Sequence, residues 1–190
     1  MEPAEPRGTR TDRTDPFDRW LAEVSADRAI GERARTWWLA RQAADEATWH
    51  GALADLAERG RPVLVELCSG RRHRGILTVV GRDFLVLRPV DGVDVVVALD
   101  AVAVLRPAPG EGPATGDREL TTVTTFAEVL AGLAGGAQEV AVWATGVTTP
   151  VVGRIAAVGR DVLAIEVAAE RSWAYLALAS VAEVSLVDSG

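Results

Sequence analysis

A thirteen-residue segment that occurs twice is the feature that most constrains the fold of this chain. The first copy spans residues 75–87 and the second spans residues 153–165. Both copies follow the pattern Gly-x-(Leu/Ile)-x-x-Val-Gly-Arg-Asp-(Phe/Val)-Leu-x-(Leu/Ile). Short apolar runs on either side of a Gly-Arg-Asp turn are typical of two strands joined by a tight connection. The sequence therefore predicts an internal duplication built from β-hairpins.

The duplication extends on both sides of this segment. Residues of a preceding helical stretch correspond at an offset of 77, so that Thr48 matches Thr125. Residues of the final strands correspond at an offset of 79, so that Leu99 matches Leu178. The one-residue slips fall between predicted strands, where loop lengths vary. We therefore expect two tandem units, each a short helix followed by five strands.

The periodicity along the chain changes from helical to alternating within each unit. A helical pattern runs from about residue 32 to 58, as one long helix or two, and Gly60 with Pro62 ends it. Thr125 and Glu128 have the spacing of a capping box, which predicts a second helix. Five short strands linked by tight turns favour a small closed barrel. We expect the strands at residues 63–68, 75–80, 84–88, 93–99 and 101–105, and again at 140–144, 151–158, 162–167, 173–178 and 181–186.

The expected fold class is mainly β with an N-terminal α part. Residues rich in proline, threonine, arginine and aspartate precede the first helical pattern, and a second segment rich in proline and glycine separates the two units. The expected organisation is a disordered tail at 1–16, a helical arm at 17–47, a barrel at 48–106, a linker at 107–120 and a second barrel at 121–190.

Composition limits the classes of function. The net charge is −7, and residues 107–190 carry four arginines against ten acids, which does not suit a protein that tracks a phosphate backbone. A single cysteine and two histidines exclude an internal disulfide and a Cys/His zinc site. No apolar run approaches the roughly 18 to 20 residues that span a bilayer, and the first residues do not resemble a secretory signal. We expect a cytoplasmic protein without cofactor, metal or membrane partner.

The first unit resembles the leading motif of the Sm/LSm family. In that motif a strand ends in Leu-x-x-Gly and the next strand begins with Gly-x-(Leu/Ile), as do Leu67-x-x-Gly70 and Gly75-Ile76-Leu77 here. The resemblance covers residues 48–106 and 125–187. The whole layout is similar to small tandem Sm-like proteins of high-GC Gram-positive bacteria. It implies an SH3-type five-stranded barrel in each unit, with open fourth and fifth strands as assembly edges. These edges could join the two barrels to each other or join chains into a ring.

The residues of the family's RNA site are missing from this chain. Sm proteins that bind RNA hold a base with an Asp-x-x-x-Asn pattern before the third strand. The corresponding residues are Gly81 and Leu85 in the first unit, and Gly159 and Leu163 in the second. None of these side chains can form a hydrogen bond with a base edge. The resemblance therefore supports the fold and argues against the usual RNA site.

Two clusters are candidate binding residues. Arg71, Arg72, His73 and Arg74 form the only basic cluster, which either contacts phosphates at a hairpin tip or is a solvated turn. Trp37 and Trp38 lie on the helical arm, where they either anchor a partner chain or help to seal the helix against a barrel.

The recurring Arg-Asp pairs and the lone cysteine have plainer interpretations. In Arg82-Asp83 and Arg160-Asp161 we interpret the aspartate as part of a turn after a glycine, where it accepts hydrogen bonds from nearby backbone amides; the alternative is a binding role. Cys68 has no implied histidine partner, so an enzyme that uses Cys68 and His73 is the weakest hypothesis.

The function expected from these observations is that of a non-catalytic interaction or assembly module. Its partner is another protein or a second copy of the chain, bound through strand edges or the helical arm. The alternative is an RNA-binding Sm-like protein with a divergent site around Arg71–Arg74.

Overall fold

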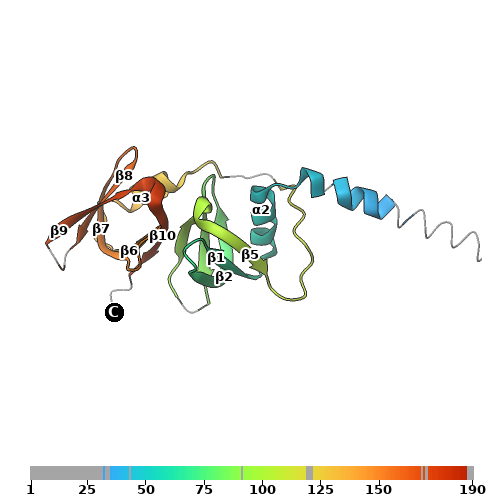
Figure 1. Cartoon of the computed structure of the whole chain (residues 1–190), viewed down its shortest axis with the longest axis horizontal. Coiled ribbons are helices and arrows are strands. Elements are labelled where there is room, and N and C mark those ends of the chain that lie inside the picture. Colours follow the sequence, from blue (N-terminus) through green and yellow to red (C-terminus); the bar gives the residue numbers. More distant parts are fainter. Residues whose placement is uncertain are drawn as a thin grey trace, which may run out of the picture. The chain divides into compact units, whose positions relative to one another are not determined.

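The computed structural model describes residues 32, 35–42, 44–90, 92–118, 122–167, 169 and 171–187. The chain divides into two compact units, residues 1–45 and 46–190. In the first unit, residues 35–42 are helical. The tail expected at 1–16 and the first part of the expected helical arm, residues 17–31, lie outside the described residues. The second unit contains strands β1 to β10, most of which are labelled in Figure 1.

The helical pattern before residue 60 consists of two helices. Residues 44–46 are helical, residues 47 and 48 are not, and helix α2 then spans Trp49–Arg59. The Thr48 side chain accepts a hydrogen bond from the Gly51 N–H and caps the helix. Gly60 adopts the left-handed conformation with φ of 60°, which a glycine tolerates without a Cβ clash. The predicted end of the helix at Gly60 is confirmed.

The first set of five strands follows α2 in chain order. Side chains alternate between buried and half-buried along β1, as the period-two pattern predicts. Gly75 allows a close approach to β3, because a Cβ at this residue would lie 2.3 Å from the Arg88 carbonyl oxygen. The strands are β1 Pro62–Leu67, β2 Arg72–Val80, β3 Phe84–Pro89, β4 Val95–Ala98 and β5 Val102–Pro107, with a 3-10 turn at Leu99–Ala101 before β5.

The second set repeats this plan. Helix α3 spans Phe126–Leu133 and begins with the predicted capping box of Thr125 and Glu128. Gly153 lies as close to the next strand as Gly75 does, since its Cβ would be 2.3 Å from the Glu166 carbonyl oxygen. The strands are β6 Val140–Ala144, β7 Val151–Val158, β8 Val162–Val167, β9 Ser172–Ala177 and β10 Val181–Leu186. We call residues 48–107 repeat 1 and residues 125–187 repeat 2.

The strands form one ten-stranded antiparallel sheet in the order β5-β1-β2-β3-β4-β10-β6-β7-β8-β9. The order within repeat 1 recurs in repeat 2, with β10 in the place of β5 and β9 in the place of β4. Among the described strands, ladder hydrogen bonds do not close either repeat on itself, as a closed barrel would require. Instead β4 pairs with β10, with Val97 opposite Glu183 and Val96 opposite Val184. The two repeats therefore pair with each other.

The hydrophobic core has two clusters, and one crosses the repeat boundary. The first cluster lies within repeat 1 and includes Leu53 of α2. The second cluster contains the core of repeat 2 together with Phe84 of β3, and Val86 and Val96 pack against it. One face of repeat 1 thus forms part of the core of repeat 2.

The segment expected as a linker packs on α2 where the structure describes it. The Arg59 guanidinium donates to the carbonyl oxygens of Gly112 and Pro113, at 2.9 and 2.8 Å. The Thr115 N–H donates to the buried carboxylate of Asp55 at 3.0 Å. The Thr48 N–H donates to the Gly116 carbonyl oxygen at 2.9 Å. These bonds hold the segment beside repeat 1.

Candidate functional site

A buried carboxylate lies at the junction between the repeats. Glu183 of β10 is 2% exposed, because β10 is paired on both sides. Its carboxylate accepts from the Arg71 guanidinium at 2.7 and 2.6 Å and contacts the His73 ring. The Arg71 guanidinium also lies 3.6 Å from the centre of the Trp143 ring. This arrangement joins the start of β2 in repeat 1 to β6 and β10 in repeat 2.

The electrostatic environment keeps Glu183 ionised. Burial alone would raise the pKa of this carboxyl group, because it penalises the charged form. Hydrogen bonds and positive charge from His73 and Arg71 outweigh burial, and the pKa lies below its ordinary value of 4.5. A charged Glu183 therefore stabilises the junction in the neutral pH range.

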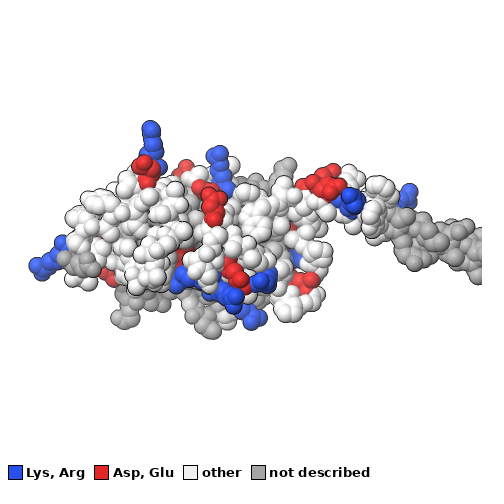
Figure 2. Space-filling model, in the orientation of Figure 1, with Lys and Arg blue, Asp and Glu red and all other residues white. Residues whose placement is uncertain are grey.

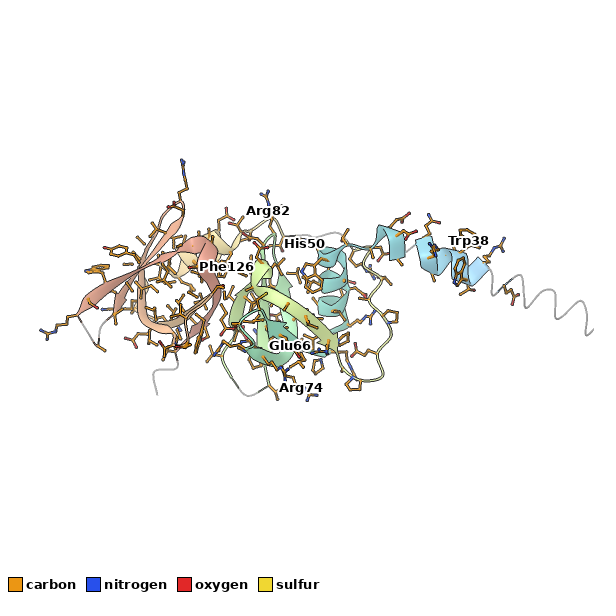
Figure 3. All side chains as sticks on the ribbon, viewed as in Figure 1. Trp38, His50, Glu66, Arg74, Arg82 and Phe126 are labelled. Atoms are coloured by element: carbon orange, nitrogen blue, oxygen red, sulfur yellow. The ribbon has the colours of Figure 1, made fainter. Side chains whose placement is uncertain are left out.

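The basic cluster of the sequence is largely paired with acids. Besides Arg71 and His73, the Arg72 guanidinium lies 3.4 Å from the Glu66 carboxylate, which also pairs with Arg106. Arg74 is exposed and forms no ion pair with the described residues; Figure 3 shows it beside Glu66 at one end of repeat 1. Figure 2 shows basic and acidic groups interspersed on the visible face rather than gathered in one basic field. Three of the four residues predicted to contact nucleic acid, Arg71, Arg72 and His73, therefore pair with acidic side chains of the protein itself.

A second contact between the repeats involves the Gly-Arg-Asp loop. The Asp83 carboxylate accepts from the Phe126 N–H at 2.6 Å, and the Arg82 N–H donates to the Thr124 carbonyl oxygen at 3.1 Å. The interpretation that this aspartate bonds nearby amides of a turn is wrong for Asp83, because its carboxylate accepts from the first N–H of the helix in the following repeat, which has no acceptor within that helix. The recurrence of Arg-Asp in both repeats was the available signal.

The fifth strands of the two repeats differ in burial. The first four residues of β10 are buried, whereas all residues of β5 are half-buried or exposed. At equivalent positions, Glu183 is 2% exposed and Val104 is 37% exposed. The difference arises because β10 has two neighbours and β5 has only β1. Among the residues that the structure describes, β5 is therefore an unpaired sheet edge.

The fourth strands differ in the same way. Val96 of β4 is half-buried against the core of repeat 2, whereas Tyr175 at the equivalent position of β9 is 71% exposed. Phe84 of β3 is 2% exposed, whereas its equivalent Val162 in β8 is 37% exposed. Among the described residues, β9 of repeat 2 is thus an unpaired sheet edge, and Tyr175 and Val162 beside it are exposed. The equivalent residues of repeat 1, Val96 and Phe84, pack against repeat 2.

A cavity of about 550 Å³ lies between the loops of the two repeats. Its lining includes Cys68, Asp100, Phe126, Arg160 and Asp161. Cys68 is exposed, and His73 is not part of the lining but contacts Glu183. The structure thus does not bring together the cysteine and histidine of the weakest hypothesis. Among the described residues there is no group of three acids, histidines or cysteines placed to hold a metal ion.

The two tryptophans of the helical arm are both exposed. Their rings meet edge to face with centres 5.3 Å apart, and the Arg41 guanidinium lies 5.5 Å from the Trp37 ring centre. The interface role of Trp37 and Trp38 stays a prediction. Replacing both with alanine and measuring the native mass tests it.

No helix in the described part of the chain has the length and apolar character needed to cross a membrane. Comparison with protein-family models and with curated proteins finds no match for this sequence.

Proposed function

We propose that the chain is a non-catalytic assembly module made of tandem Sm-like barrels. In this proposal copies join head to tail, with β9 of one copy paired to β5 of the next. One observation carries it: β4 of repeat 1 pairs with β10 of repeat 2, and among the described residues the equivalent strands β9 and β5 have no such partner. An unpaired edge exposes backbone donors and acceptors that another strand can satisfy.

The internal junction fixes the expected register between copies. Val97 and Val96 lie opposite Glu183 and Val184. Residues of β9 correspond to those of β4, and residues of β10 to those of β5, at an offset of 79. In the register of the internal junction, Leu176 of one copy would therefore lie opposite Val104 of the next copy, and Tyr175 opposite Leu105. The same operation brings Val162 to the position that Phe84 occupies at the internal junction. The pairing would therefore cover Tyr175 and Val162, two exposed apolar side chains of β8 and β9.

The two kinds of junction would be chemically different. At the internal junction, Glu183 meets Arg71 and His73. At the equivalent positions of a junction between copies, Val104 would face Thr149 and Val151 of repeat 2. The ionic cluster would thus be replaced by a contact between uncharged side chains. If β10 paired with β9 of another copy instead of β4, the buried Glu183 carboxylate would meet Thr149 and Val151 and would have no positive partner. The cost of burying that unpaired charge favours the correct pairing of β10 with β4.

The charge distribution favours protein over RNA as the partner. The chain has a net charge of −7, and Arg71, Arg72 and His73 are already paired with Glu183 and Glu66. Binding of phosphates by these side chains would compete with contacts that hold the repeats together. Association through strand edges requires no such competition.

The native mass measured against concentration tests the proposal. Wild-type protein is expected to form species larger than one chain. Tyr175→Lys and Val104→Lys each place a charge on one edge and should shift the protein toward a single chain. Val90→Lys alters an equally exposed apolar residue outside both edges and should leave the mass unchanged. A wild-type protein that stays a single chain at all concentrations would contradict the proposal.

A further inference from the structure

The Gly-Arg-Asp loops of the two repeats have the same internal bonds. The Gly81 N–H donates to the Phe84 carbonyl oxygen at 2.8 Å, and Gly159 donates to Val162 at the same distance. The Asp83 and Asp161 carbonyl oxygens accept from Leu99 and Leu178, at 2.9 and 2.8 Å. The two loops are therefore built alike.

Two bonds of the first loop have no counterpart in the second. The Asp83 carboxylate accepts from the Phe126 N–H, and the Arg82 N–H donates to the Thr124 carbonyl oxygen. Both bonds reach the start of α3 in the following repeat. Asp161 and Arg160 are exposed, and within the described residues neither the Asp161 carboxylate nor the Arg160 N–H has a hydrogen-bond partner.

The start of α2 offers the matching set of groups. Trp49 occupies the position that Phe126 occupies in α3, and its N–H has no acceptor within the helix. The neighbouring donors are satisfied, since the Thr48 N–H bonds to Gly116 and the Gly51 N–H bonds to the Thr48 side chain. Within the described part of the chain, Trp49 is thus left with an open donor at the N-terminus of an eleven-residue helix, where a carboxylate is favoured.

The surroundings of α2 are already arranged for this contact. At the internal junction, the cavity lining contains Asp83, Phe126, Ala127 and Arg160. Ala127 and Arg160 correspond to His50 and Arg82 of repeat 1. The His50 ring contacts the Arg82 carbonyl oxygen at 2.8 Å, and Figure 3 shows the two residues close together beside α2. At the start of α2, Trp49, His50 and Arg82 thus correspond to Phe126, Ala127 and Arg160 of the internal junction. The one group still missing there is a carboxylate equivalent to that of Asp83.

We propose that Asp161 of one copy caps helix α2 of the next copy by accepting a hydrogen bond from the Trp49 N–H. The Arg160 N–H then donates to the Ala47 carbonyl oxygen, as Arg82 does to Thr124 at the internal junction. The contact rests on the proposed head-to-tail assembly, since it forms only when β9 and β5 pair.

Substitutions at Asp161 test the acceptor. Asp161→Ala removes the carboxylate and should raise the dissociation constant for self-association about 5- to 30-fold, the upper part of the range that loss of a side-chain cap gives. Asp161→Asn keeps an oxygen acceptor and should stay within about threefold of wild type, because asparagine caps helices as well as aspartate does. Asp100→Ala removes another acid of the same cavity and should have no effect.

Substitutions at Trp49 test the donor. Trp49→Pro removes the N–H while keeping the helix, because proline suits the first helical position and Thr48 has the extended conformation that a following proline requires. Trp49→Ala removes the indole and keeps the N–H. The dissociation constant of Trp49→Pro should exceed that of Trp49→Ala about 5- to 30-fold. In a Trp49→Ala background, Asp161→Ala should weaken association by that same factor. In a Trp49→Pro background it should add less than about twofold, because both changes remove one bond.

Sedimentation equilibrium with circular dichroism on each variant separates the outcomes. The inference stands if Asp161→Ala and Trp49→Pro weaken association non-additively while both remain folded. It is overturned if wild type and Tyr175→Lys differ in mass while Asp161→Ala matches wild type, a result that leaves the assembly itself intact. A wild-type protein that is always a single chain overturns both the assembly and the cap.

Discussion

The Arg71 guanidinium lies 2.6 Å from the Glu183 carboxylate, although 112 residues separate the two along the chain. The contact brings the start of β2 in repeat 1 against β10, the final strand of repeat 2. It explains why a cluster that looks like a nucleic-acid contact in the sequence serves to hold two repeats together.

Loss of the Glu183 charge should destabilise the whole second unit of the chain. Glu183→Gln leaves Arg71 and His73 beside a neutral amide, and the free energy of unfolding should fall by about 2 kcal/mol. Urea denaturation followed by circular dichroism measures this. As a control, Glu166→Gln alters an ion pair with Arg154 in which both side chains are more than a third exposed, and should change stability by less than about 1 kcal/mol.

The contribution of Glu183 should depend on pH in a defined direction. The pKa of this carboxyl is lowered in the folded protein, so the unfolded state binds its proton more readily as the pH falls. The stability difference between wild type and Glu183→Gln should be present above pH 4.5 and shrink as the pH falls further. Denaturation series at several pH values measure it. A difference that grows on acidification would contradict the assigned role.

Equivalent positions in the two repeats should tolerate truncation differently. Phe84→Ala removes a side chain that is buried in the core of repeat 2 and should cost about 3 to 5 kcal/mol. Val162→Ala changes the equivalent, partly exposed position and should cost less than about 1.5 kcal/mol. Both values should be measured at a concentration where the protein is a single chain. Similar costs would show that Phe84 does not bridge the repeats.

RNA binding should be weak and lost in salt. Of the basic cluster only Arg74 is free of ion pairs within the described residues, and one phosphate contact gives little affinity. Fluorescence anisotropy with A-rich, U-rich and structured RNA should show no micromolar binding at physiological salt. Binding that persists there and is abolished by Arg74→Ala would favour the RNA alternative.

Much of the secondary structure could be predicted from the sequence. The bounds of β6, β7, β8 and β10 match the expected strands, and the caps at Thr125 and Gly60 are where local patterns place them. Such features depend on neighbours a few residues away. The comparison of two similar repeats strengthened each assignment, because the same pattern had to fit both.

The junction could not be predicted in this way. The partner of Arg71 is a glutamate whose equivalent in repeat 1 is Val104, so the duplication gives no hint of the pair. Burial of Glu183 depends on the pairing of β4 with β10, which no local pattern specifies. Asp83 looked like a turn residue because its donor, the Phe126 N–H, lies 43 residues away.

Mixing two edge variants tests the head-to-tail assembly most directly. Tyr175→Lys keeps β5 intact, and Val104→Lys keeps β9 intact. Each variant alone should sediment as a single chain, and the equimolar mixture should form a one-to-one dimer that grows no further, because only one competent pair of edges remains. A mixture that stays at the mass of a single chain, while wild type assembles, would contradict pairing of β9 with β5.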